Sequence, residues 1–96
     1  MPTTTPGSEL PVVTVVHAPA CHFCDDAQQA LAAFATRFAF SVELVDAEEP
    51  RGAALMATHR APMFPLILID GAFFSSGRLP RKKLHKLLEA RAPLVA

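Results

Sequence analysis

The sequence has no long hydrophobic run and no excess of charge of one sign. Its longest apolar stretch, Met63 to Ile69, has only seven residues and includes Pro65, whereas a transmembrane helix needs about 20. The nine basic and nine acidic residues cancel, so the composition carries no electrostatic footprint for nucleic acid or for an anionic membrane. We therefore expect partners other than nucleic acids and membranes.

The first ten residues also lack the basic and apolar regions of a signal peptide. Their proline, threonine, glycine and serine content predicts a flexible leader over residues 1–10. A chain of 96 residues is long enough for one domain, and no internal repeat divides it, so a single domain is predicted over residues 11–92. The absence of a targeting signal predicts a cytoplasmic protein.

Cysteine is scarce. The sequence has only Cys21 and Cys24, three positions apart. A structural disulfide is improbable in a reducing cytosol, and so short a loop would constrain the unfolded chain only weakly. The spacing therefore favours a reactive pair over a structural one.

Strand-like and helix-like patterns alternate along the rest of the chain. Continuous or alternating apolar residues predict strands at 12–16, 40–44, 66–69 and 72–74, and apolar residues at helical spacing or starting prolines predict helices at about 22–38, 50–61 and from 80 onward. Strands separated by helices favour parallel pairing, whereas Asp70-Gly71 predicts a closing antiparallel hairpin. The predicted fold is α/β, in the order βαβαββα, with a four-stranded mixed sheet flanked by helices on both faces.

Side-chain patterns also predict the core. Four phenylalanines are expected inside the domain, namely Phe34, Phe38, Phe73 and Phe74. The last helix should point its leucines inward and its basic residues, Arg81, Lys82, Lys83 and Lys86, into solvent. His59 and His85 are interpreted as solvated helix positions.

The cysteine pair directly follows the first predicted strand and opens the first helix. A helix N-terminus carries unpaired N–H groups and a partial positive charge, which favour a thiolate. Cys21 should be accessible at that terminus and more acidic than a free cysteine, whereas Cys24 should be shielded one turn inside. This asymmetry suits attack by Cys21 on a substrate disulfide and resolution of the mixed disulfide by Cys24.

A second unusual element is Phe64-Pro65, directly before the third strand. Proline cannot donate to a sheet ladder, so its position at the start of an apolar strand needs a reason. A cis Phe64–Pro65 bond would turn the backbone of Phe64 outward, where it could pair with an extended peptide or a thiol ligand.

These residues carry a resemblance to a known family. Cys21-His22-Phe23-Cys24, Pro65 about forty residues later and Ile69-Asp70-Gly71 resemble the thioredoxin superfamily, nearest its glutaredoxin-like members, and Ser76-Gly77-Arg78-Leu79 resembles a family of small glutaredoxin-like proteins. The resemblance implies a thioredoxin-like fold, Cys21 as the nucleophile, Cys24 as the resolving thiol and Pro65 as a cis-proline facing them. The residues predicted to contact substrate are His22, Phe23, Phe64 and Pro65, with Ser76, Gly77 and Arg78 as further candidates.

Two positions depart from the glutaredoxin pattern. Ala18 stands where glutaredoxins typically carry a lysine, and Arg78 stands where they carry an aspartate that holds the amino group of glutathione. A cation facing an ammonium group is repulsive, so glutathione binding should be weak. Electron donors of ribonucleotide reductase share a Ser-Gly-Arg-like stretch and are recycled by thioredoxin reductase, so the electron donor is left open between a reductase and a low-molecular-weight thiol.

The function predicted from the sequence is thiol–disulfide exchange with protein or small-molecule disulfides, with no cofactor and no resident metal. One alternative is a redox-inactive adaptor of the same fold that binds peptides beside Pro65. A second alternative is a metal or iron–sulfur carrier using the same cysteines, although zinc usually takes four ligands and the chain has no second Cys-x-x-Cys spacing.

Overall fold

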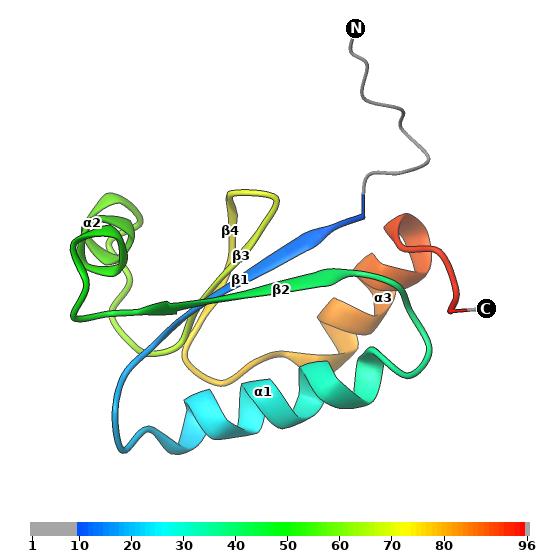
Figure 1. Cartoon of the computed structure of the whole chain (residues 1–96), viewed down its shortest axis with the longest axis horizontal. Helices are drawn as coiled ribbons and strands as arrows, with labels where there is room; N and C mark the ends of the chain where they lie inside the picture. The colour runs from blue at the N-terminus through cyan, green and yellow to red at the C-terminus, as the bar shows by residue number, and fades with distance from the viewer. Residues whose placement is uncertain (1–9, 96) are drawn as a thin grey trace, which may run out of the picture.

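A computed structural model describes residues 10–95, so the predicted leader lies outside the described residues except for Leu10. The chain forms seven elements, which are β1 (Val12–His17), α1 (His22–Phe34), β2 (Ser41–Asp46), α2 (Pro50–Thr58), β3 (Leu66–Ile69), β4 (Ala72–Ser76) and α3 (Arg81–Arg91) (Figure 1). The predicted order βαβαββα is confirmed. Within residues 10–95, no helix is long and apolar enough to cross a membrane.

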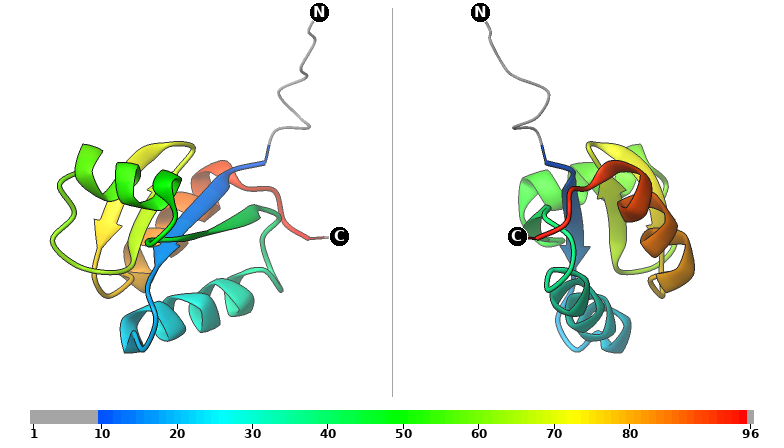
Figure 2. Two further views of the ribbon diagram at one scale, coloured as in Figure 1. Left: turned by 60° about the vertical axis from the view of Figure 1, so that its left-hand side comes forward. Right: turned by 90° about the vertical axis from the view of Figure 1, so that its right-hand side faces the viewer.

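The four strands form one mixed sheet in the order β2-β1-β3-β4. β1 pairs in parallel with β2 and antiparallel with β3, and β3 pairs antiparallel with β4. Helices α1 and α3 cover one face and α2 covers the other, as the rotated views show (Figure 2). The predicted mixed sheet with helices on both faces is confirmed.

β1 separates two cores because successive side chains of a strand point to opposite faces. Val13 and Val15 pack toward α1 and α3, together with Leu31 and Leu84. Val16 packs toward α2 with Val45, Leu66 and Leu68. The central strand is therefore buried on both sides, as its continuous β-branched run predicts.

Helix α1 ends at Phe34, four residues before the predicted end at Phe38. The backbone tightens there, because the N–H groups of Thr36 and Arg37 donate to carbonyls only three residues back, the pattern of a 3₁₀ turn. Phe38 nevertheless stays in the core and bridges to Leu94. The periodicity thus identified the buried residues correctly but extended the helix one turn too far.

Several apolar side chains of the two edge strands are exposed. Val42 and Leu44 of β2 are 44% and 52% exposed, and Phe73 of β4 is 52% exposed and wrongly predicted as core. Phe73 instead lies beside His59 at 6.4 Å between ring centroids. An edge strand has a neighbour on one side only, so its side chains find less cover than those of β1 and β3.

The aromatic cluster at the far end of α1 corrects another prediction. His85 of α3 stacks on Phe34 with ring centroids 5.9 Å apart and meets Phe38 edge-on at 5.7 Å. Its Nε2 atom is buried without a hydrogen-bond partner among the described residues. His85 therefore packs between the helices with 36% of its side chain still exposed, so it is less solvated than the sequence indicated.

The predicted Asp70-Gly71 hairpin turn is confirmed. Both residues have positive φ, 51° and 85°, the region that a type I′ turn requires. The Asp70 carboxylate also accepts the N–H of Val12 at 2.9 Å and pairs with Arg91. One side chain therefore links the turn to the start of β1 and to the end of α3.

The residues after α3 pair with the turn between α1 and β2. The N–H of Ala39 donates to the Pro93 carbonyl at 2.7 Å, and the N–H of Val95 donates to the Arg37 carbonyl at 2.9 Å. This segment therefore fixes the backbone of Arg37 and Ala39.

Candidate functional site

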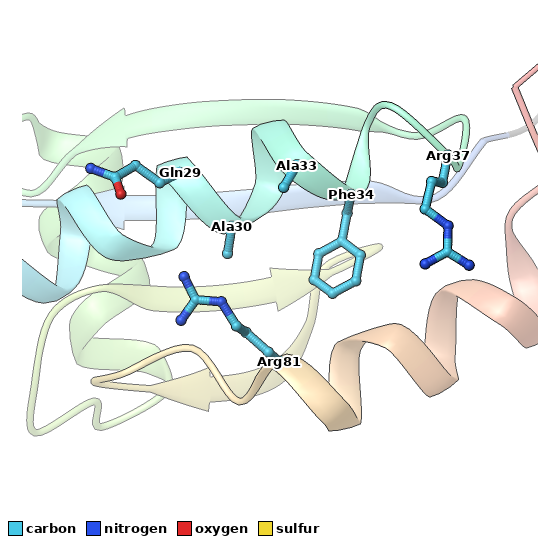
Figure 3. A pocket seen from close by; sticks show the side chains of 6 residues that line it. All are labelled: Gln29, Ala30, Ala33, Phe34, Arg37 and Arg81. Atoms are coloured by element: carbon cyan, nitrogen blue, oxygen red, sulfur yellow. The ribbon is translucent and has the colours of Figure 1, made fainter.

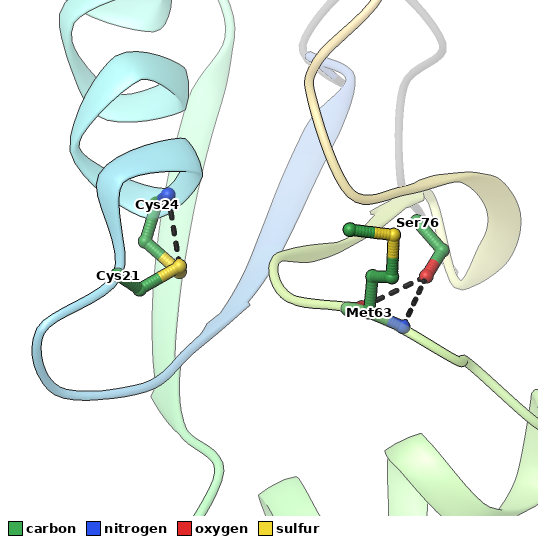
Figure 4. The surroundings of a disulfide bond; sticks show 4 residues. All are labelled: Cys21, Cys24, Met63 and Ser76. Carbon is green, nitrogen blue, oxygen red and sulfur yellow. Dashed lines mark hydrogen bonds between the residues drawn. A yellow bond between two sulfur atoms is a disulfide. The ribbon is translucent and has the colours of Figure 1, made fainter.

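The two cysteines lie where β1 leads into α1. Cys21 is the N-cap of α1, with extended backbone angles (φ −117°, ψ 106°), and Cys24 lies in the first turn of the helix. The three-residue separation brings their Cα atoms to 5.2 Å, and the two sulfurs form a disulfide (Figure 4). This Cα separation falls in the usual range for bridged cysteines.

The two cysteines differ in exposure and in contacts. Cys21 is half-buried, whereas Cys24 is only 2% exposed and lies on the buried face of α1. The backbone N–H of Cys24 donates to the Cys21 sulfur at 3.1 Å. This is the capping bond of a helix N-terminus, with a sulfur in the place of the usual oxygen.

Such a capping bond favours negative charge on the Cys21 sulfur. The first N–H groups of a helix have no intrahelical partner, and the helix dipole adds partial positive charge there. When the disulfide is reduced, the same position stabilises a thiolate relative to a thiol. The arrangement therefore supports an accessible, activated sulfur beside a shielded one.

The loop before the pair turns sharply. Ala20 has φ +52°, a left-handed conformation that residues other than glycine adopt uncommonly. Pro19 and Ala20 are exposed and Ala18 is half-buried. The turn connects the buried end of β1 to the N-terminus of α1 and leaves Cys21 near the surface.

Pro65 begins the segment that leads into β3. The Phe64–Pro65 peptide bond is cis, as expected. Pro65 is buried, its carbonyl accepts the N–H of Gly77 at 3.0 Å, and Phe64 is half-buried. The loop before β3 is thereby joined to the end of β4.

Ser76 strengthens this connection. Its hydroxyl accepts the N–H of Met63 at 3.1 Å and donates to the Met63 carbonyl at 2.8 Å (Figure 4). The Ser76 hydroxyl, a further candidate for substrate contact in the sequence, is thus already engaged within the protein. Its two bonds hold the loop on which Met63 and Phe64 lie.

Gly77 has a backbone conformation that favours glycine. It has φ +93°, and a Cβ atom at this position would lie 3.4 Å from the Met63 sulfur. The exposed Met63 side chain therefore lies over Gly77, on the loop that Figure 4 draws across from the disulfide. Sequence reasoning missed Met63, whose only signal is its position two residues before Pro65.

The remaining candidates lie on the surface. His22 and Phe23, in the first turn of α1 between the two cysteines, are exposed, and Arg78 is exposed after Gly77. The apolar groups of Phe23 and Met63 are both accessible. Figure 4 places the loop of Met63 and the end of β4 at Ser76 across from the cysteine pair.

An ion pair joins the beginnings of α1 and α3. The Arg81 guanidinium donates to both oxygens of the Asp26 carboxylate, at 3.0 and 3.2 Å. Asp26 lies in α1, two residues after Cys24. The pair fixes the start of α3 beside the helix that carries the cysteines, and a two-bond geometry is more specific than a single contact.

The acidic group with a shifted pKa lies away from the cysteines. Hydrogen bonds from the Arg51 guanidinium and from the Thr14 hydroxyl lower the pKa of Glu43 on β2.

Among residues 10–95, no group of three or more histidine, cysteine, aspartate or glutamate side chains is placed to hold a metal ion.

Comparison with known proteins supports the fold. No family model matches the sequence, and no curated protein matches it either. The solution structure of an uncharacterised thioredoxin-like protein from Clostridium perfringens matches with a TM-score of 0.66 and 16% sequence identity, covering 85% of this chain and 71% of that one. The fold is therefore thioredoxin-like, as predicted.

Proposed function

We propose that this chain is a thiol–disulfide oxidoreductase that uses Cys21 and Cys24. The observation that carries the proposal is the 3.1 Å bond from the Cys24 N–H to the sulfur of Cys21, at the start of a helix and beside a second, buried sulfur. A purely structural disulfide needs neither an activated sulfur nor this difference in exposure. The thioredoxin-like fold supports the same chemistry.

The reaction has two exchange steps. In the reduced protein, the Cys21 thiolate attacks a substrate disulfide, a mixed disulfide with Cys21 forms, and the first half of the substrate leaves as a thiolate. The Cys24 thiolate then attacks the Cys21 sulfur and releases the second half. Two electrons have moved from the protein dithiol to the substrate, and the two protons of that dithiol go to the released thiols through solvent.

The reaction consumes the dithiol, so turnover requires a donor of two electrons. A reductase or a low-molecular-weight thiol would reduce the Cys21–Cys24 disulfide, in a cytoplasmic setting. Ala18 and Arg78 argue against glutathione as a tightly bound donor, since Arg78 presents a cation where an ammonium group would lie. Parallel assays with glutathione plus its reductase, and with thioredoxin reductase plus NADPH, identify the donor.

The proposed substrate surface surrounds the pair. His22, Phe23, Phe64 and Pro65 would contact the substrate, and Phe23 and Met63 offer exposed apolar groups that suit peptide side chains. Gly77 and Arg78 would lie beside them. Ser76 would act indirectly, because its hydroxyl holds Met63.

The test is reduction of insulin or hydroxyethyl disulfide by the reduced protein. Cys21→Ser should abolish the activity, because the attacking sulfur is lost. Cys24→Ser should retain the first step and accumulate a mixed disulfide at Cys21, visible as a mass increase that dithiothreitol removes. Full activity in Cys21→Ser would show that another group attacks.

The same assay separates the proposal from its alternatives. A peptide-binding adaptor would reduce no disulfide and would show no cysteine that reacts faster with iodoacetamide than a free cysteine. A metal carrier would be purified with a stoichiometric metal ion, which elemental analysis would detect.

A further inference from the structure

A groove lies between α1 and the first turn of α3, along the helix from the cysteine pair. It has a volume of about 480 Å³ and is lined by Gln29, Ala30, Ala33, Phe34, Arg37 and Arg81. Figure 3 shows the Phe34 ring between the two arginine side chains. A hollow of this size is within the range that accommodates ligands.

The floor of the groove is apolar and held in place. Ala30 and Ala33 are too small to fill the space between the helices, which leaves the hollow open above them. Phe34 is half-buried and stacks on His85 at 5.9 Å, with an angle of 18° between the ring planes. The aromatic surface at the groove is therefore available without rearrangement.

Fixed positive charge flanks this floor. Arg81 is oriented by its two bonds to Asp26, whose carboxylate offsets its charge. The Arg37 guanidinium lies over the Phe38 ring, 5.4 Å from the centroid, and the ion pairs among the described residues do not include it. Both cations are thus held near the groove, and that of Arg37 has no counter-charge of its own within residues 10–95.

The positive charge continues beyond the groove. The chain is neutral as a whole, yet α3 carries five basic residues and a single acidic one. Lys82 and Lys86 are both exposed and lie one helical turn apart beside Arg81. An occupant with negative charge spread along a chain would match this surface better than a compact molecule.

We propose that the groove binds an acidic segment of a partner protein. An apolar or aromatic side chain of the segment would rest on Ala33 and Phe34. A carboxylate beside it would pair with Arg37, whose charge is unpaired within residues 10–95, and further carboxylates would meet the exposed Lys82 and Lys86. Arginine on a carboxylate gives strong, directional bonds, and the small alanines provide the space for the anchor. This site is separate from the cysteine pair and does not depend on its chemistry.

The test uses the full 96-residue protein and a fluorescein-labelled heptapeptide with a central phenylalanine between three acidic residues on each side. Fluorescence anisotropy should show saturable binding that weakens as salt rises. Amide shifts in a ¹⁵N-labelled sample should change mainly at residues 29–37 and at Arg81. Replacing the central phenylalanine by serine should weaken binding, because the anchor is lost.

Two variants with matched controls locate the site. Arg37→Glu should weaken binding about ten-fold or more, the effect expected from loss of one charged pair, whereas Arg60→Glu makes the same charge change after α2 and should weaken it far less. Ala33→Glu fills the groove and adds a negative charge at an exposed helix position, so it should abolish binding. Ala54→Glu, an exposed position of α2, is its control.

Several outcomes would overturn the proposal. Equal losses in Arg37→Glu and Arg60→Glu would show attraction by overall charge alone, and shifts away from residues 29–37 would place the peptide elsewhere. Binding of 3-phenylpropionate as tight as that of the peptide would identify a small aromatic carboxylate as the occupant. Because binding involves no thiol chemistry, failure of the redox proposal would leave this result unaffected.

Discussion

The two faces of the sheet carry hydrophobic cores of different size, and we call the larger one the thicker core and the smaller one the thinner core. Among residues 10–95, the hydrophobic cluster on the face covered by α1 and α3 has twelve buried members, whereas the cluster on the face covered by α2 has four. The helix that begins at the cysteines thus rests on the thicker core. On the thinner side, α2 is held by close backbone approach and by polar bonds, with less apolar burial.

This difference indicates which core holds the cysteine pair in place. The position of Cys21 depends on the placement of α1 against β1 and α3, which buried side chains such as Leu31 and Leu84 determine. The thinner face supports β1 from behind and has no part in capping the cysteine pair. Damage to the thicker face should therefore affect both stability and the cysteines, and damage to the thinner one mainly stability.

The largest effect is expected from Leu84→Ala on the thicker face. Leu84 is fully buried, and removing such a side chain costs about 2–5 kcal/mol because it leaves a cavity. Leu55→Ala on α2, where the side chain is half-buried, should cost less. Urea unfolding of both variants measures the difference, and equal losses would contradict the inequality of the two faces.

The next effect concerns the close approach on the thinner face. A Cβ atom on Gly52 would lie 2.0 Å from the Asp46 carbonyl oxygen, so Gly52→Ala should destabilise the protein by about 1–3 kcal/mol, as overpacking does. Glycine to alanine in an ordinary helix instead stabilises by about 1 kcal/mol. The sign of the change in unfolding free energy of Gly52→Ala, measured by urea unfolding, distinguishes these two effects. A stabilised variant would show that α2 is free to move away from β2.

A smaller effect is expected at the end of β4, where neighbouring serines face opposite sides. Ser76→Ala removes two hydrogen bonds to Met63 and should cost about 1–2 kcal/mol. Ser75→Ala is the matched control, because the buried Ser75 hydroxyl has no partner among the described residues, so its removal should be neutral or stabilising. Thermal unfolding compares them, and an equal loss would mean that the bonds to Met63 add nothing.

The smallest effect concerns pH on the thinner face. Bonding to Arg51 first, and to Thr14 second, holds the pKa of Glu43 below its ordinary value of 4.5. The folded state thus binds the Glu43 proton less readily than the unfolded state, so this contribution is present above pH 4.5 and is lost as pH falls through the lower folded pKa. In Glu43→Gln, stability should fall less steeply between about pH 5 and 3 than in the original protein. If the curves of unfolding free energy against pH ran parallel for the two proteins, Glu43 would make no pH-dependent contribution to stability.

The elements that the sequence predicted best are those with strong local signals. Leu66 to Ile69 form β3 as expected, since an uninterrupted apolar run beside a turn leaves few alternatives. The Asp70-Gly71 turn and the placement of Cys21 and Cys24 at a helix start also follow from neighbouring residues. The substrate contacts assigned to His22, Phe23, Phe64, Pro65 and the 76–78 segment stay predictions.

The features that sequence reasoning missed depend on contacts between distant segments. The exposure of Val42 and Phe73 follows from their places on the two edge strands, which the alternation of residues within a strand does not reveal. The partial burial of His85 follows from its contact with Phe34 across two helices. The two hydrogen bonds between the Ser76 hydroxyl and the Met63 backbone likewise join residues thirteen positions apart, so no local pattern signals them.

The pairing of residues 93–95 with the α1–β2 turn has a practical consequence. Because the N–H of Val95 is bonded to the Arg37 carbonyl, shortening the protein to Ala92 would release the backbone of an arginine that the peptide is expected to meet. Such a truncated form would weaken peptide capture without any change in the arginine itself. A purification handle for that assay should therefore not be fused directly to this stretch.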